Sequence, residues 1–226
     1  MRPSVSSPRI KICGLTLPEQ AVQCASLGAH AIGCVFFQKS PRFVSDSQAT
    51  EICDAVAGQA AVVGIFVNDP FDAIIQKVQR CGLTGVQLHG AEPPELITRL
   101  RRKGVIVIKA LFTQKTPSFS LADRYSGASA FLTECGEGKL PGGNAQAWNW
   151  AEARAINIDR PLILAGGLDP DNIATAITAA MPDAVDVSSG VEVEPGRKDM
   201  DKVARFIKAV NNTTVHPTPR EIFKET

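Results

Sequence analysis

Polar and ionisable side chains stand at the ends of several short apolar runs in this sequence. Cys13 closes the run RIKIC, and Glu134 lies near the end of SAFLTEC. Gln87 and His89 close GVQLH, and Asp186 lies within AVDVSSG. A thiol or a carboxyl group held close to a substrate is able to take up or release a proton. If the ends of these runs meet in the fold, the residues predict a site for acid–base chemistry.

Two glycine-containing segments predict a site for a phosphate group. LAGGL contains Gly166 and Gly167, and DVSSGVE contains Ser188, Ser189 and Gly190. Glycine lets the backbone approach an anion closely and turn its N–H groups toward it. The alternative is that the glycines only form tight turns. Two such segments at the ends of neighbouring apolar runs favour phosphate binding.

The apolar runs recur along the whole chain and predict eight β-strands. Most are rich in Val, Ile and Phe and lack strict alternation of apolar and polar residues. That composition is typical of strands covered on both faces. The predicted strands cover residues 9–13, 31–37, 60–67, 85–89, 105–111, 129–135, 161–167 and 184–190.

Amphipathic stretches between the strands predict helices. The clearer ones begin near Pro, Ser or Asp and end near Gly, which are typical helix start and stop signals. Two weaker patterns lie at residues 118–127 and 145–156. All the predicted helices cover residues 17–29, 45–58, 70–82, 92–104, 118–127, 145–156, 169–180 and 198–210.

Strand followed by helix, eight times over, predicts an α/β fold with a parallel sheet. The repeats fill the chain almost completely, which favours a single (β/α)8 TIM barrel over residues 1–210; an open doubly wound sheet is the alternative. Residues 211–226 are predicted to be a C-terminal tail. In such barrels the active site lies at the C-terminal ends of the strands, and the loops after strands seven and eight commonly bind phosphate. Lys11 and Lys109 also lie near predicted strand ends and are further candidates.

Composition argues against several classes of partner. Lys and Arg number 24 against 23 Asp and Glu, whereas proteins that bind nucleic acid usually carry a basic excess. No apolar run reaches the ~18 residues typical of a membrane span, and the N-terminus has no signal-peptide pattern, so we expect a cytoplasmic protein. The six cysteines form no C-x-x-C pair and the three histidines are scattered, which predicts reduced thiols and no metal ion.

A set of motifs closely resembles the phosphoribosylanthranilate isomerase family of tryptophan biosynthesis. The resemblance runs in order over residues 9–207. KICG, SPR and SSGVE-x-x-PGRKD are highly specific when they occur together. The matching motifs are KICGLT (11–16), FFQKSPR (36–42), QLHG (87–90), LAGGLDPDN (164–172), DVSSGVE (186–192) and PGRKD (195–199).

The resemblance implies an Amadori-type isomerisation in the third step from chorismate to tryptophan. N-(5′-phosphoribosyl)anthranilate becomes 1-(2-carboxyphenylamino)-1-deoxyribulose 5-phosphate. An acid protonates the ring oxygen of the ribose, and a base removes the proton from C2′. Because hydrogen moves within the substrate, no cofactor is expected. Cys13 matches the general base of the family, and we expect a nearby cation, with Lys11 as candidate, to lower the pKa of the thiol toward neutrality.

The sixth strand departs from the family pattern. The family usually has Asp at its end, followed by Gly-Gly-Thr-Gly, whereas this chain has Glu134 there and Asn144 and Ala145 in place of Thr-Gly. Glu134 is therefore the expected general acid, with a reach that differs by about an ångström, enough to affect catalysis strongly. Glu137 in the following loop is the alternative acid.

The resemblance also implies the groups that bind the substrate. Arg42 matches an arginine that binds the anthranilate carboxylate, for which a guanidinium fork is well suited; a solvated loop arginine is the alternative. His89 and Gln87 are expected to bind beneath the ligand, and Asp186 to orient other groups. The small-molecule substrate is the expected partner, and the chain is expected to be a monomer, with a dimer as the alternative.

Two other functions compete with this assignment. The altered loop after the sixth strand leaves open a catalytically silent phosphate-binding barrel. An isomerase of histidine biosynthesis, of the ProFAR type, catalyses the same rearrangement on a similar barrel. That enzyme uses a carboxylate base on the first strand and a substrate with two phosphates, so Cys13 and the one predicted phosphate site argue against it.

Overall fold

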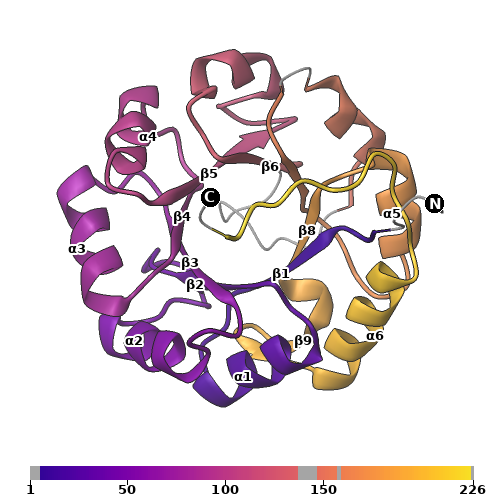
Figure 1. The fold of residues 1–226 in the computed structure, drawn as a ribbon, viewed down its shortest axis with the longest axis horizontal. Helices are drawn as coiled ribbons and strands as arrows, with labels where there is room; N and C mark the ends of the chain where they lie inside the picture. Colours follow the sequence, from indigo (N-terminus) through magenta and orange to yellow (C-terminus); the bar gives the residue numbers. More distant parts are fainter. Residues whose placement is uncertain (1–5, 137–146, 157–158, 225–226) are drawn as a thin grey trace.

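The computed structural model describes residues 6–136, 147–156 and 159–224, in which eight parallel strands close into a barrel (Figure 1). The strands pair in chain order, and β8 pairs with β1 to complete the ring. The single TIM barrel is therefore confirmed, and the open sheet is excluded. The strands are β1 (Arg9–Cys13), β2 (Ala31–Val35), β3 (Ala61–Phe66), β4 (Gly85–Leu88), β5 (Ile106–Phe112), β6 (Ala130–Glu134), β7 (Leu162–Leu164) and β8 (Ala184–Val187).

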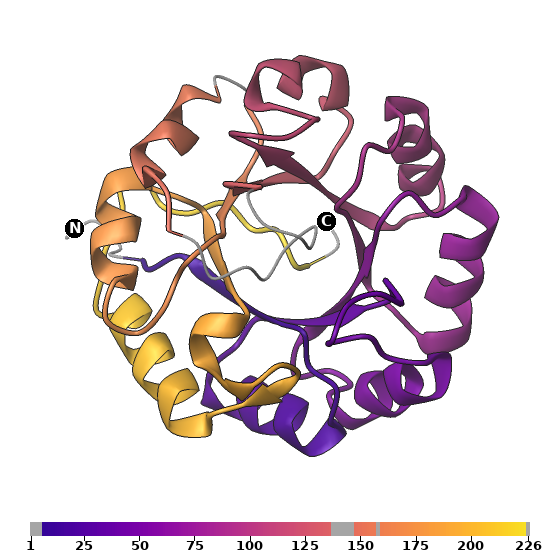
Figure 2. The same cartoon turned by 180° about the vertical axis from the view of Figure 1, so that it is seen from behind.

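Helices surround the barrel in both axial views (Figures 1 and 2). In the described part of the chain, none is long and apolar enough to cross a membrane. The α-helices are α1 (Pro18–Leu27), α2 (Asp46–Ala55), α3 (Phe71–Cys81), α4 (Pro94–Arg101), α5 (Ile173–Ala180) and α6 (Met200–Asn211). Short 3₁₀-helices are η1 (Phe119–Tyr125), η2 (Trp150–Ala155) and η3 (Ser189–Val191).

The two weaker helical patterns do not form α-helices. The segments at 118–127 and 145–156 contain η1 and η2, with seven and six residues, and positions 145–146 lie outside the described residues. So few residues gain little from α-helical hydrogen bonds after the costly first turn, and 3₁₀ geometry is common in such short pieces. The prediction of α-helices was therefore wrong for these segments.

Side chains of each strand alternate between the barrel interior and the layer beneath the helices. Ile10 and Ile12 of β1 belong to the large core between strands and helices. Lys11 and Cys13 consequently point into the barrel. The same alternation places polar side chains of β4, β6 and β8 in the interior, near the C-terminal ends of these strands.

Lys109 on β5 lies on the other side of the barrel wall. Its neighbours Val107 and Leu111 belong to the outer core, and its ammonium group donates to Glu92 Oε2 (2.7 Å) and to the Gly90 carbonyl oxygen (2.6 Å). The prediction of Lys109 as a candidate site residue was wrong, because the two-residue alternation of the strand turns its side chain away from the barrel interior. The buried pair instead stabilises the loop after β4.

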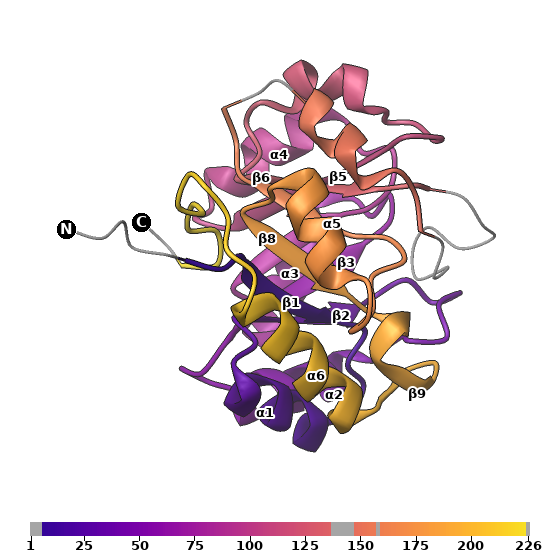
Figure 3. The same ribbon diagram turned by 90° about the vertical axis from the view of Figure 1, so that its right-hand side faces the viewer.

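The C-terminal tail packs against the N-terminal end of the barrel. Ile222 and Phe223 are buried in the cluster that fills the barrel interior, together with alanines at the starts of four strands, Ala31, Ala61, Ala130 and Ala184. Arg220 donates to both carboxylate oxygens of Asp183, just before β8. Figure 3 shows this segment at the end of the barrel opposite β9. The base of the barrel is thus closed by the chain's own C-terminus.

Candidate active site

The interior ends of β1 and β8 bring Cys13, Lys11 and Asp186 together. The Lys11 ammonium lies 3.0 Å from Asp186 Oδ1, and its side chain is fully buried. The ammonium group also lies near enough to the Cys13 thiol for each to shift the pKa of the other. Cys13 packs against Val35 and Ile65 in a small cluster of its own. The thiol therefore faces the barrel interior beside a buried ion pair.

Burial raises the pKa of the Cys13 thiol, although Lys11 and Lys198 act in the opposite direction. Lys11 is thus the expected neighbour, but the predicted net lowering toward neutrality was wrong. The free-energy cost of removing water from around a thiolate is larger than the stabilisation by the nearby Lys11 ammonium. The Asp186 carboxylate destabilises the thiolate further. Burial alone lowers the pKa of Lys11, but Asp186 and the thiol outweigh this effect and raise it. Lys11 therefore stays charged while the thiol stays protonated near neutral pH.

Glu134, His89 and Gln87 form a second interior group, carried by β6, β4 and the residue after β4. Glu134 Oε2 lies 3.1 Å from His89 Nε2, and the Gln87 amide donates to His89 Nδ1 (2.9 Å). Since Nδ1 accepts this bond, Nε2 carries the proton that faces Glu134. The Glu134 carboxylate also lies close enough to Asp186 for the two charges to repel. The two interior groups therefore border the same space.

The loops after β7 and β8 lie against each other. A Cβ on Gly190 would be 1.9 Å from the carbonyl oxygen of Leu168, so only glycine fits at this contact. Gly166 and Gly167 both adopt positive φ angles, 89° and 68°. Helix η3 begins at Ser189, and the first N–H groups of a helical turn have no acceptor within that turn. The predicted phosphate-binding residues are therefore brought together at one corner of the barrel mouth.

Two tryptophans hold the glycine turn after β7, and sequence analysis missed both. The Trp148 and Trp150 indole N–H groups donate to the carbonyl oxygens of Ala165 (2.9 Å) and Gly166 (3.1 Å). A Cβ on Gly166 would lie 3.2 Å from Cγ of Glu134, so the turn also packs against the carboxylate side chain. Both tryptophans fall in a segment that was predicted to be helical, and that pattern contains no information about indole donors.

Arg42 is a buried ion-pair partner, only 6% exposed, so a solvated loop arginine is excluded. Its Nε donates to Glu192 Oε1 (2.9 Å) and its Nη2 to Glu192 Oε2 (2.6 Å). Its aliphatic stem crosses Gly14, where a Cβ would lie 2.5 Å from Arg42 Cδ. Gly14 follows Cys13 directly, so the guanidinium group lies next to the thiol end of β1.

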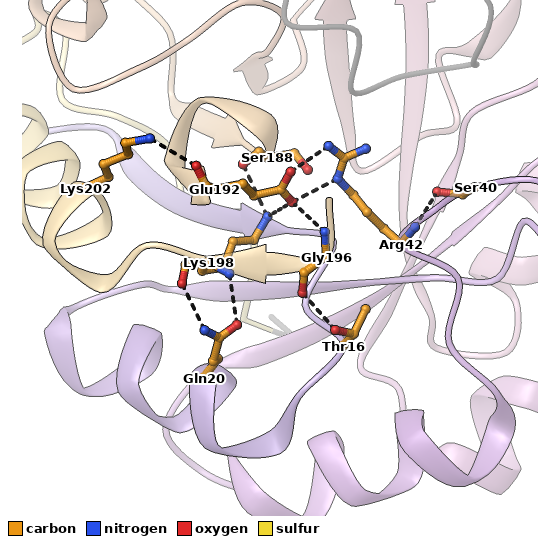
Figure 4. Close-up of polar contacts among 9 residues, drawn as sticks. All are labelled: Thr16, Gln20, Ser40, Arg42, Ser188, Glu192, Gly196, Lys198 and Lys202. Carbon is orange, nitrogen blue, oxygen red and sulfur yellow. Dashed lines mark hydrogen bonds and ion pairs between the residues drawn. The ribbon is translucent and has the colours of Figure 1, made fainter. Parts of the chain in front are cut away.

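Glu192 and Lys198 complete this network and were not predicted as site residues (Figure 4). They lie on the hairpin formed by β9 (Glu192–Glu194) and β10 (Arg197–Lys198). Lys198 Nζ donates to Glu192 Oε1 (2.7 Å) and to the carbonyl oxygen of Ser188 (3.2 Å). Both residues belong to the SSGVE-x-x-PGRKD motif. The motif does not reveal that Glu192 pairs with Arg42, which lies 150 positions away.

Three residues of the sixth-strand prediction, Glu137, Asn144 and Ala145, lie outside the described residues. Within the residues that the structure does describe, no group of His, Cys, Asp and Glu is arranged to hold a metal ion. The described candidates for proton transfer are therefore Cys13 and Glu134, on different strands of the same barrel mouth.

Comparison with known proteins identifies the family to which the chain belongs. The family model for N-(5′-phosphoribosyl)anthranilate (PRA) isomerase matches residues 10–209. The N-(5′-phosphoribosyl)anthranilate isomerase of Desulfatibacillum aliphaticivorans is 54% identical over 215 residues, covering 95% of this chain and 98% of the relative. The relative from Geobacter metallireducens is 44% identical over 200 residues, covering 88% and 97%.

Solved structures give the same result. The phosphoribosyl anthranilate isomerase of Thermotoga maritima superposes with a TM-score of 0.82 at 36% identity, covering 90% of this chain and 98% of that one. A phosphoribosyl anthranilate isomerase solved with reduced 1-(o-carboxyphenylamino)-1-deoxyribulose 5-phosphate gives a TM-score of 0.79 at 35% identity, with the same coverage. On the strength of the family model and these relatives, the chain belongs to the N-(5′-phosphoribosyl)anthranilate isomerase family.

Proposed function

We propose that this protein isomerises N-(5′-phosphoribosyl)anthranilate to 1-(2-carboxyphenylamino)-1-deoxyribulose 5-phosphate, with Glu134 as general acid and Cys13 as general base. The observation that carries the proposal is the placement of these two side chains. One is a thiol on β1 and the other a carboxyl group on β6, and both point into the C-terminal end of the same barrel. Acid and base from different strands can contact a ribose ring from different directions.

The proposed reaction has two proton transfers. The protonated Glu134 donates to the ring oxygen, the bond from that oxygen to C1′ breaks, and a protonated Schiff base forms at C1′. The Cys13 thiolate then removes the proton from C2′, and the C–H electron pair forms the enolamine. Tautomerisation gives the ketone at C2′, so C1′ is reduced and C2′ is oxidised within one molecule. No external oxidant or reductant is needed.

Neighbouring groups support both transfers. His89 Nε2–H, 3.1 Å from Glu134 Oε2, stabilises the carboxylate that remains after the acid has donated its proton. The Lys11 ammonium favours the thiolate form of Cys13. Gln87 Oε1 is buried without a hydrogen-bond partner among the described residues. It is therefore available to accept a bond from a ribose hydroxyl group, as expected for a substrate-binding residue.

The remaining predicted residues bind the two ends of the substrate. Gly166, Gly167, Ser188, Ser189 and Gly190 are proposed to hold the phosphate group with backbone N–H and hydroxyl donors. Arg42 is proposed to bind the anthranilate carboxylate, and the Lys11–Asp186 pair is proposed to orient the thiol. Held by its phosphate and its carboxylate, the substrate is proposed to present its ribose to the acid and the base.

The test is loss of phosphoribosylanthranilate fluorescence in the presence of the purified protein. We expect turnover by the wild type and a loss of kcat of about 100-fold or more in Cys13→Ala and in Glu134→Gln, the scale of general acid–base catalysis. Glu134→Asp is expected to keep the acid but lose about 10-fold or more in kcat, because the shorter side chain withdraws the carboxyl group from its position beside Gly166.

Each outcome discriminates between the functions. Absence of turnover by the wild type would support the silent phosphate-binding barrel. Unchanged turnover in Glu134→Gln would assign the acid role to another carboxylate, with Glu137 as the next candidate. Growth of a tryptophan-requiring strain that lacks this step, when it is supplied with this protein, tests the same activity in a cell.

We also propose that the chain is a cytoplasmic monomer. The N-terminal end of the barrel is covered by the chain's own Ile222 and Phe223, so that end presents little apolar surface to a second copy. The Thermotoga maritima relative, in contrast, is described as dimeric. Light scattering should give a single mass near 24.1 kDa; twice that mass would contradict the proposal.

A further inference from the structure

The network around Glu192 joins two buried cations to one buried carboxylate (Figure 4). Side-chain exposure is 7% for Arg42 and 4% for Glu192, and 0% for Lys198. Removing charges from water is costly, and a buried pair rarely repays that cost in stability alone. Because one carboxylate faces two cations, the cluster keeps a net positive charge. A buried cluster with a net positive charge favours the binding of a further anion.

The hydrogen bonds of Arg42 show where that anion would bind. Glu192 occupies one edge of the guanidinium group, formed by Nε and Nη2. A guanidinium group has five N–H donors and can meet two carboxylates on different edges. In the described part of the chain, Arg42 Nη1 donates no hydrogen bond to another residue. The edge formed by Nη1 and the second N–H of Nη2 is therefore available to a second carboxylate.

The hairpin that carries Glu192 is held rigidly against the loop after β1. Gln20 exchanges two hydrogen bonds of 2.9 Å with the backbone of Lys198, and Thr16 Oγ1 donates to the carbonyl oxygen of Gly196 (2.8 Å). The Gly196 N–H in turn donates to Glu192 Oε1. The same loop carries Gly14, over which the stem of Arg42 passes. The position of the guanidinium group is thus defined from both sides.

We propose that Glu192, assisted by Lys198, is a positioning residue that directs the free edge of Arg42 toward the aromatic carboxylate of the substrate and makes this carboxylate a requirement for tight binding. The inference rests on the proposed function, because it takes its substrate from there. Glu192 does not touch the reacting atoms. It acts through Arg42, whose free edge it orients toward the carboxylate of the substrate.

The test compares two substrates in one variant. Glu192→Gln keeps the shape of the side chain but removes its charge. Kinetics are measured with N-(5′-phosphoribosyl)anthranilate and with the matching N-phosphoribosyl aniline, which lacks the carboxylate. We expect the ratio of kcat/KM between the two substrates to fall about 10- to 100-fold in the variant, the scale of a hydrogen bond to a charged group. The loss should appear mainly as a higher KM for the carboxylated substrate.

Glu194→Gln is the matched control. It makes the same chemical change on the same hairpin, but Glu194 is 64% exposed and pairs with Arg197, which is 65% exposed. Its substrate ratio is expected to equal that of the wild type. A purely structural role for Glu192 would lower the rates with both substrates together, and would leave their ratio unchanged.

The possible outcomes separate the inference from the proposed function. No turnover of either substrate by the wild type contradicts the proposed function itself. Turnover by the wild type together with an unchanged ratio in Glu192→Gln overturns the positioning role. If Glu192→Gln does not fold by circular dichroism, Lys198→Met is measured in its place, because it keeps Arg42 and Glu192 but removes the second cation that holds the Glu192 carboxylate in position. Its ratio is expected to fall as well, and an unchanged ratio there overturns the proposal.

Discussion

At the scale of the residue, the site separates side chains that are proposed to touch the substrate from side chains that hold them. Cys13, Glu134 and Arg42 each have a buried polar or charged neighbour, Lys11, His89 and Glu192 respectively. An unpaired buried charge is costly, whereas a paired one has a defined position. The neighbours therefore orient the groups that are proposed to act.

The pH dependence of the reaction follows from the raised pKa of Cys13. The proposed base is the thiolate, and burial raises the pKa of the thiol so that it stays protonated near neutrality. The reaction needs this thiolate together with the protonated general acid, so the active fraction of the enzyme is level between the pKa values of the two groups, and we expect the thiol to set the alkaline limb of the pH profile of kcat/KM. Lys11→Met removes the neighbour that lowers this pKa most strongly. The alkaline limb should therefore move to higher pH, and the rate at pH 7 should fall because less thiolate is present.

The pKa of the Cys13 thiol is expected to rise in Lys11→Met whether or not Asp186 is ionised. If Asp186 stays ionised after Lys11→Met, its charge raises the pKa of the thiol further; if it takes up a proton, the larger effect of Lys11 is still lost. The pH profiles of kcat/KM for the wild type and the variant measure the shift. An alkaline limb that moves to lower pH in the variant would contradict the role assigned to the thiol.

At the scale of the element, the close contact between the loops after β7 and β8 determines the shape of the phosphate site. Gly190→Ala would place a methyl group 1.9 Å from the carbonyl oxygen of Leu168, so the loops must separate. We expect KM for the phosphorylated substrate to rise about 10-fold or more, because a site displaced by about an ångström loses much of its binding. Stability should fall by about 1–3 kcal/mol, as for other overpacked positions.

Gly58→Ala provides the control for backbone strain. Gly58 has a positive φ of 74°, and a Cβ there would meet no atom within 4 Å. The Gly58→Ala variant is expected to lose about 1 kcal/mol of folding stability, with no change in KM. Steady-state kinetics and urea unfolding of the two variants test the prediction, and a normal KM in Gly190→Ala would show that the contact is not needed for phosphate binding.

At the scale of the whole molecule, the C-terminal tail stabilises the barrel from the end opposite the active site. Phe223 is 6% exposed and packs into the barrel interior. Phe223→Ala is expected to lower the free energy of unfolding by about 3 kcal/mol, the lower end for deletion of a buried aromatic ring. The rate of catalysis at 25 °C should stay close to that of the wild type, because the proton-transfer groups lie at the other end.

Leu27→Ala is the matched control for this variant, since Leu27 is 41% exposed at the end of α1. Surface changes of this kind usually alter stability by about 0.5 kcal/mol or less. Urea unfolding measures both variants. Equal stability of Phe223→Ala and the wild type would contradict the packing of the tail against the barrel.

Much of the site could be predicted because a barrel collects the C-terminal ends of its strands at one mouth. Cys13, Glu134, His89 and Asp186 were expected there for this reason, and the structure places them inside the barrel near that mouth. Glu192 and Lys198 could not be predicted in the same way. They lie beyond the last strand on a hairpin whose partner, Arg42, is remote in the sequence, and no periodicity indicates such a contact.

The amino-acid sequence by itself determined the order of strands, the barrel and the motifs of the site, because apolar periodicity and turn residues act over a few neighbouring positions. Only the tertiary structure decided that the Cys13 thiol has a raised pKa, that Arg42 binds Glu192, and that the tail covers the base of the barrel. Each of these depends on the loss of water around a group and on partners far away in the chain, and both arise only when the chain has folded.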